Sequence, residues 1–105
     1  MLFIFEVEIG EGYSAEQYAE AWVRASRLIQ QAEGAAGTRL HRCIGDPRRL
    51  LAIARWESKA ARDAMAGAPQ AQIREIIDGQ AEFVSVRILG EFEEAEWRVD
   101  PPDAQ

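Results

Sequence analysis

The residues best suited to bind an aromatic ligand gather around the end of one apolar segment. Residues 50–54 are Leu-Leu-Ala-Ile-Ala, and Trp56 follows two positions later. An indole at the end of a strand can wall a pocket and stack on an aromatic substrate, or it can simply fill the core. Small side chains on the same strand face leave room for an open cavity or for a space filled by Trp22 and Phe5. The candidate substrate-binding residues are therefore Trp56, Tyr18, Trp22, Ala52 and Ala54.

The candidate general base is His41, the only histidine in the chain. Its imidazole could take a proton near neutral pH or hydrogen-bond to a phenol oxygen. The structural alternative is a histidine on an outer strand that pairs with a glutamate, and no second group at a fixed spacing decides between the two. Cys43 would share its strand face, but two ligands without a third do not make a metal site. We therefore expect no metal and no bound cofactor.

The spacing of apolar residues predicts alternating strands and helices. Alternation over residues 2–9 predicts a strand, and Ser14 with Gln17 three residues later predicts a capped helix that continues to about residue 32. The remaining expected elements are a strand over 38–45, a turn at Gly45–Pro47, a strand over 50–57, a short helix capped by Ser58, a helix from about Pro69 to Asp78, and a strand over 82–92. This β-α-β-β-α-β order is typical of the ferredoxin-like fold, an α+β architecture with helices on one face of a four-stranded antiparallel sheet.

The sheet face opposite the helices is expected to be both charged and apolar. Strand alternation places Glu6, Arg55 and Arg87 on this face, among apolar residues such as Ile53 and Leu89. Such a surface is too apolar to be simply solvated, and charges buried against it would have to pair. We therefore expect a homodimer formed through the open sheet face, with glutamates and arginines joined in an ion network.

Composition and charge favour one globular domain and argue against some kinds of partner. The chain has 105 residues, of which 48% are hydrophobic, and a formal net charge of −6. Residues 91–105 hold six acidic residues and one arginine, so the body is nearly neutral and the end is acidic. Neither part has the basic stripe that nucleic acid or an anionic membrane would require. The apolar start includes Glu6 and Glu8, which fits a strand better than a signal peptide, so we expect a cytoplasmic protein.

The chain resembles the antibiotic-biosynthesis monooxygenase (ABM) family, a branch of the dimeric α+β barrel superfamily. The resemblance rests on the element order, on GTRLHR at residues 37–42, and on residues 50–65, where Trp56-Glu57-Ser58 is the most recognisable part. It covers residues 1–92, so we expect a family domain over 1–92 followed by an acidic tail over 93–105. It implies that two sheets pack face to face into a barrel and that a substrate lies between sheet and helices.

Members of this family differ in chemistry. Some oxygenate phenols, anthrones or quinols with O₂ and without metal or flavin, whereas others degrade haem with a histidine on the helix that follows the strand-three tryptophan. Residues 58–79 contain no histidine, which disfavours haem degradation. The resemblance thus implies a cofactor-independent monooxygenase that acts on a small aromatic, phenolic or quinol substrate. The alternatives are a barrel that binds a small ligand without turnover and an isomerase or cyclase that works without O₂.

Overall fold

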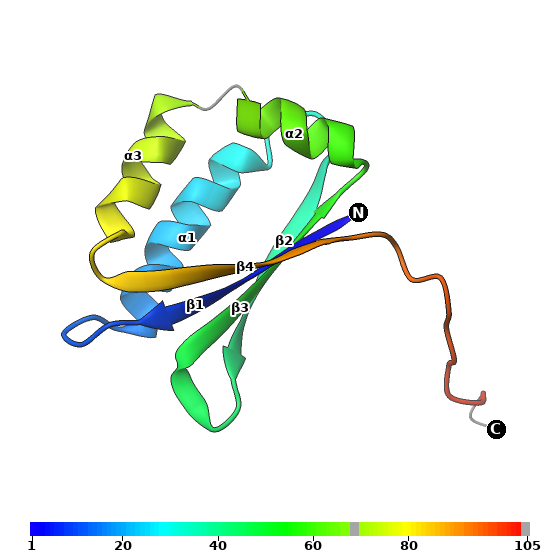
Figure 1. Cartoon of the computed structure of the whole chain (residues 1–105), viewed down its shortest axis with the longest axis horizontal. Coiled ribbons are helices and arrows are strands. Elements are labelled where there is room, and N and C mark those ends of the chain that lie inside the picture. Colours follow the sequence, from blue (N-terminus) through cyan, green and yellow to red (C-terminus); the bar gives the residue numbers. More distant parts are fainter. Residues whose placement is uncertain (68–69, 104–105) are drawn as a thin grey trace.

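The computed structural model of the chain describes residues 1–67 and 70–103. Its four strands form one antiparallel sheet in the order β2-β3-β1-β4, and the helices lie on one face of it (Figure 1). This arrangement confirms the predicted ferredoxin-like α+β fold. In chain order the elements are β1 (Leu2–Ile9), α1 (Ala15–Ile29), β2 (Ala35–Cys43), β3 (Asp46–Trp56), α2 (Lys59–Gly67), α3 (Ala71–Gln80) and β4 (Val84–Phe92).

The start of α1 is fixed by the predicted capping box. The backbone N–H of Gln17 donates to the hydroxyl of Ser14 at 3.1 Å, and the backbone N–H of Ser14 donates to the side-chain oxygen of Gln17 at 2.9 Å. The helix ends at Ile29, earlier than predicted, because the chain then turns through Gly34 at a φ of 85°. Glycine adopts this left-handed conformation without strain, and β2 begins directly after it.

The hairpin between β2 and β3 is longer than predicted. Cys43 pairs with Asp46, so that Ile44 and Gly45 alone form the turn. Gly45 has a φ of 90°, which a two-residue hairpin turn favours. The predicted turn at residues 45–47 was therefore too late in the sequence, and β3 begins well before residue 50. The predicted start of the last helix, Pro69, lies outside the described residues.

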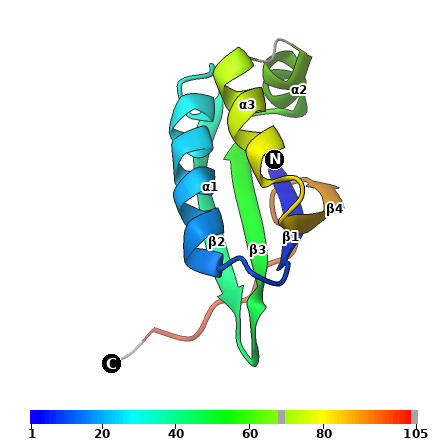
Figure 2. The ribbon, with the colours of Figure 1, turned by 90° about the vertical axis from the view of Figure 1, so that its left-hand side faces the viewer.

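The helices cover the sheet unevenly. Figure 2 shows α1 and α3 side by side on one face of the sheet, and α3 packs chiefly on α1. Val86 and Ile88 pair with Val7 and Phe5, which places them on the helix-facing side of β4. They are nevertheless 54% and 64% exposed. The helix-facing side of the sheet is thus incompletely covered along β4.

A β-bulge changes the facing of residues at the end of β4. Ile4 pairs with Gly90 while Phe5 pairs with Ile88, which leaves Leu89 as the extra residue. Beyond the bulge, Glu91 lies opposite Phe3 and so faces the helices. The chain then leaves the body, and residues 93–103 form no helix or strand (Figure 1).

Candidate functional site

A cavity of about 490 Å³ lies between the helix-facing side of the sheet and the helices. This volume falls in the range of roughly 300–1,000 Å³ that is typical of sites for small organic ligands. The lining is mostly apolar and aromatic. It includes Phe3 and Phe5 on β1, Ala54 and Trp56 on β3, Tyr18 and Trp22 on α1, Arg62 and Met65 on α2, and Ile76 and Ile77 on α3.

Small side chains leave the space that forms this cavity. Ala54 on β3 lies between Phe3 and Thr38 of the neighbouring strands, and all three line the cavity. Trp22 lies in the wall rather than across the space, which answers the question left open by the sequence in favour of an open cavity. Ala52, by contrast, is completely buried and lies outside the lining. Its predicted contact with substrate is therefore not supported by its position.

Trp56 is held in place by the first residue of the chain. Its backbone N–H donates to the carbonyl oxygen of Met1 at 2.9 Å, and the Met1 ammonium donates back to the Trp56 carbonyl oxygen at 2.9 Å. The residue is only 3% exposed, so its indole lies almost entirely within the protein. The wall that Trp56 contributes is consequently anchored at the ends of two adjacent strands.

Tyr18 supplies a hydrogen-bond donor in the cavity wall. The residue is buried, and its hydroxyl makes no hydrogen bond to any part of the chain that the structure describes, although it is not sealed from the cavity. Burial, and secondarily the charge of Tyr13, raise the pKa of Tyr18 to about 12. The phenol therefore remains protonated near neutral pH. It can donate a hydrogen bond to a ligand, but it cannot serve as a base there.

Arg62 is a functional candidate that the sequence reasoning missed. Its guanidinium carbon lies 4.0 Å from the centroid of the Phe3 ring, a cation–π contact at the cavity wall. Met65, three residues later, also lines the cavity, so both residues share the face of α2 that looks inward. That spacing was visible in the sequence, but the direction in which the short helix faces was not.

His41 lies on the other face of the sheet. It pairs with Leu51 across the β2–β3 ladder, is exposed, and lines a separate hollow of about 300 Å³ with Glu6 and Arg49. The sheet itself stands between His41 and Trp56. The proposed catalytic base and the proposed binding residues are therefore not brought together, and His41 cannot accept a proton from a ligand held in the aromatic cavity.

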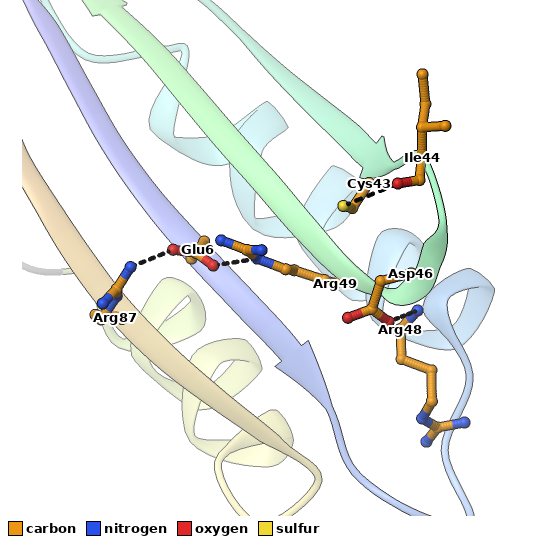
Figure 3. A network of polar contacts seen from close by, with 7 residues as sticks. All are labelled: Glu6, Cys43, Ile44, Asp46, Arg48, Arg49 and Arg87. Carbon is orange, nitrogen blue, oxygen red and sulfur yellow. Dashed lines mark hydrogen bonds and ion pairs between the residues drawn. The ribbon is translucent and has the colours of Figure 1, made fainter.

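The open sheet face carries an ion network within the single chain. Glu6 accepts hydrogen bonds from Arg49 and from Arg87, the latter at 2.7 Å (Figure 3). These bonds, Arg49 first and Arg87 second, lower the pKa of Glu6 below its ordinary value. Arg55 instead pairs with Glu94, beyond the last strand. Glu6 thus pairs with arginines of the neighbouring strands, as expected, whereas Arg55 pairs with a glutamate outside the strands.

The cavity offers hydrogen-bonding groups and one positive charge but, among its described lining residues, no carboxylate or imidazole that could act as a base. Among its described lining residues, only Tyr18 and Arg62 carry ionisable groups, and the other polar side chains are those of Ser26, Gln30, Thr38 and Gln80. Within the same part of the chain, no cluster of three His, Cys, Asp or Glu side chains could hold a metal ion. No helix in residues 1–67 or 70–103 is long and apolar enough to cross a membrane.

Solved structures share this fold at low sequence identity. SnoaB, a cofactor-independent oxygenase from Streptomyces nogalater, is similar with a TM-score of 0.76 and 14% identity over 97% of this chain and 96% of that one. Rv0793 from Mycobacterium tuberculosis has a TM-score of 0.65 and 15% identity over 90% and 98% of the two chains. PA3566 from Pseudomonas aeruginosa has a TM-score of 0.61 and 15% identity over 88% and 94%. No curated protein matches the sequence.

The family is established by the sequence itself. A sequence model of the family described as "Antibiotic biosynthesis monooxygenase" matches residues 2–73, which is more than half of the chain. The matched region begins with β1 and includes Trp56, Arg62 and most of the cavity wall. With the ferredoxin-like fold in agreement, the chain belongs to the antibiotic biosynthesis monooxygenase family.

Proposed function

We propose that this protein is a cofactor-independent monooxygenase whose cavity binds a small aromatic, phenolic or quinol substrate. The observation that carries the proposal is the aromatic cavity, in which Trp22 and Trp56 offer apolar ring surfaces and Tyr18 offers a hydroxyl donor. Such walls favour a flat ring system, and the donor suits a phenol or ketone oxygen on it. The similarity in fold to SnoaB, itself a cofactor-independent oxygenase, supports this reaction class.

The proposed reaction requires a substrate that can give electrons to O₂ directly. For a methylene carbon the balanced change is R₂CH₂ + O₂ → R₂C=O + H₂O, in which O₂ gains four electrons and one of its oxygen atoms leaves as water. The substrate must first lose a proton to form a carbanion. Since the described lining contains no base, the substrate must be acidic enough to release that proton to solvent near neutral pH.

The protein would contribute positioning and stabilisation of the anion. A hydrogen bond from Tyr18 to the substrate oxygen favours the enolate or phenolate over its neutral form. The apolar walls hold the ring in one orientation while O₂ reacts with the carbanion. The buried position of Tyr18, which keeps its own proton in place, makes it a donor throughout the reaction.

The absence of a base in the described lining also favours a second candidate function. A cavity with apolar surface and hydrogen-bonding groups is sufficient to bind an aromatic ligand without turnover. An isomerase or cyclase would need an acid and a base close together, and the described lining provides no such pair. We therefore retain ligand binding without turnover as the alternative.

We also propose that a second copy of the chain covers the open sheet face. Leu89 and Phe92 on this face are 41% and 47% exposed, and Leu89 lines the same hollow as Glu6, which pairs with Arg87. Reversing one charge, in Arg87→Glu, should place like charges together and dissociate the dimer. Sedimentation velocity at low micromolar concentration tests this, with Arg74→Glu on the exposed side of α3 as the control. An Arg87→Glu protein that remains dimeric would contradict the role of the ion network.

The test of the proposed activity is oxygen uptake by the metal-stripped protein with anthrones, naphthols and hydroquinones. We expect uptake above the spontaneous rate, reduced about tenfold in Tyr18→Phe because one charge-assisted hydrogen bond to the substrate anion is lost. His41→Gln, on the other face, should keep the full rate. Uptake at the spontaneous rate for every compound, with ligands still raising the melting temperature, would replace the oxygenase by the binding function. Uptake lost in His41→Gln and kept in Tyr18→Phe would move the chemistry to the other face.

A further inference from the structure

Arg62 is a cation in an apolar wall without an acidic partner. Its side chain is half-buried and lies over the ring of Phe3. Across residues 1–67 and 70–103, no carboxylate lies within ion-pair distance of it. A partly buried cation has lost some of its hydration, so its attraction to an anion is stronger than that of a fully solvated cation. Its position therefore favours a ligand that brings negative charge.

Two acidic groups at this end of the cavity, Glu91 and Asp63, bind another cation. Glu91, which the bulge in β4 turns toward the helices, lies 3.2 Å from the ammonium of Lys59. Asp63 lies 3.1 Å from the same ammonium. Both carboxylates thus contact Lys59 and neither contacts Arg62. The Arg62 guanidinium instead lies over the aromatic ring of Phe3.

The two ionisable groups of the described cavity wall, Tyr18 and Arg62, are separated along β1. Tyr18 packs in the cluster that contains Val7 and Leu50, whereas Arg62 lies over Phe3. Phe3 and Val7 are four residues apart on one strand, which corresponds to about 13 Å. The surface between them includes the apolar side chains of Phe5 and Ala54. A ligand that reaches both polar groups must therefore be an extended, largely apolar molecule.

We propose that Arg62 selects a carboxylate, so that the substrate class is an aromatic acid whose ring system lies along the cavity between Arg62 and Tyr18. This inference rests on the proposed function, since it specifies the substrate of the same cavity. A guanidinium matches the geometry of a carboxylate with two parallel hydrogen bonds. One cation with no second basic residue in the described lining suits a singly charged carboxylate better than a doubly charged phosphate.

The test compares two probes of nearly equal shape, anthracene-9-carboxylate and 9-anthracenemethanol, by isothermal titration calorimetry. The wild-type protein should bind the carboxylate about tenfold more tightly than the alcohol, as expected for one charge-assisted interaction at a half-buried site. Arg62→Gln should bind both probes equally, at the affinity of the alcohol. Arg74→Gln removes the same charge from an exposed position on α3 and should keep the preference. Melting temperatures of both variants establish that each is folded.

The outcomes separate this inference from the proposed function. Equal binding of the two probes by the wild-type protein, or a preference that survives in Arg62→Gln, would overturn the role of Arg62 and leave the aromatic cavity standing. A preference lost equally in Arg74→Gln would also overturn it, because the effect would then belong to overall charge. No binding of either probe would overturn both proposals. Arg62→Lys adds a further check, since it should retain part of the preference by charge alone.

Discussion

Filling the cavity should stabilise the protein and abolish ligand binding in the same variant. Ala54 offers the most direct position, because it lies in the cavity floor between Phe3 and Thr38. In Ala54→Leu, three added carbon atoms would extend into space that a ligand would otherwise occupy. Because this space is open, the change costs no overpacking, and the free energy of unfolding should rise.

The size of this effect follows from how enclosed the cavity is. Three buried carbons are worth at most about 2.4 kcal/mol at about 0.8 kcal/mol each. Ile77 and Val86, which line the cavity, are 55% and 54% exposed, so its rim is open to solvent and the gain should be near 1 kcal/mol. For a domain of this size, that corresponds to a rise of about 4–8 °C in melting temperature. Binding of an aromatic ligand should weaken by at least tenfold, because the new side chain overlaps the ring.

Differential scanning calorimetry and titration with anthracene-9-carboxylate measure both quantities. Ala52→Leu is the matched control, since Ala52 is completely buried on the same strand and outside the lining. The same enlargement there should overpack the core and lower stability by about 1–3 kcal/mol. If Ala54→Leu also lowers stability, the space beside Ala54 is closed in solution and the cavity argument fails. If it raises stability and leaves ligand affinity unchanged, the ligand binds elsewhere.

Three further predictions concern single groups. Tyr18→Phe should change the melting temperature little, because the hydroxyl has no partner in the described chain, yet it should weaken binding of a phenolic ligand about tenfold by calorimetry. The pKa of Glu6 is lowered in the folded state, so the stability it contributes is complete above its unfolded pKa of about 4.5 and is lost as pH falls through the folded value. Urea midpoints should therefore separate wild type from Glu6→Gln at pH 7, and the difference should shrink as the pH falls below the unfolded pKa of about 4.5; a difference that does not change with pH would contradict this. Ser14→Ala should lower the free energy of unfolding by about 1 kcal/mol through loss of the cap, and an unchanged urea midpoint would show that the capping box is not formed.

The helices and strands could be predicted from the sequence where they depend on patterns within a few residues. The alternation of residues 2–9 and the pairing of Ser14 with Gln17 each specify an element through contacts within one or two turns of chain. Element ends were less predictable. The β2–β3 hairpin extends to Cys43 and Asp46 because strand pairing continues as far as the turn allows, and only the left-handed Gly45 limits it.

The candidate site was predicted in part. Trp56, Tyr18, Trp22 and Ala54 all line the cavity, because the periods of strand and helix determine which side chains face inward. Whether that space stays open depends on how α3 packs against α1, a contact between distant segments that no local pattern encodes. Arg62 was missed for the same reason, since its role depends on a contact with Phe3 across the fold.

The two faces of the sheet carry different functional groups, and the β4 bulge determines on which face Glu91 lies. Without the extra residue Leu89, strand alternation would place Glu91 on the open face, beyond reach of the helices. The bulge instead brings Glu91 opposite Phe3, where it binds Lys59. The bulge therefore brings a carboxylate, Glu91, close to the Phe3 end of the cavity, where Lys59 balances its charge. Arg62 has no ion-pair partner in the described residues even with this acid nearby, so its charge is available for the ligand that we propose.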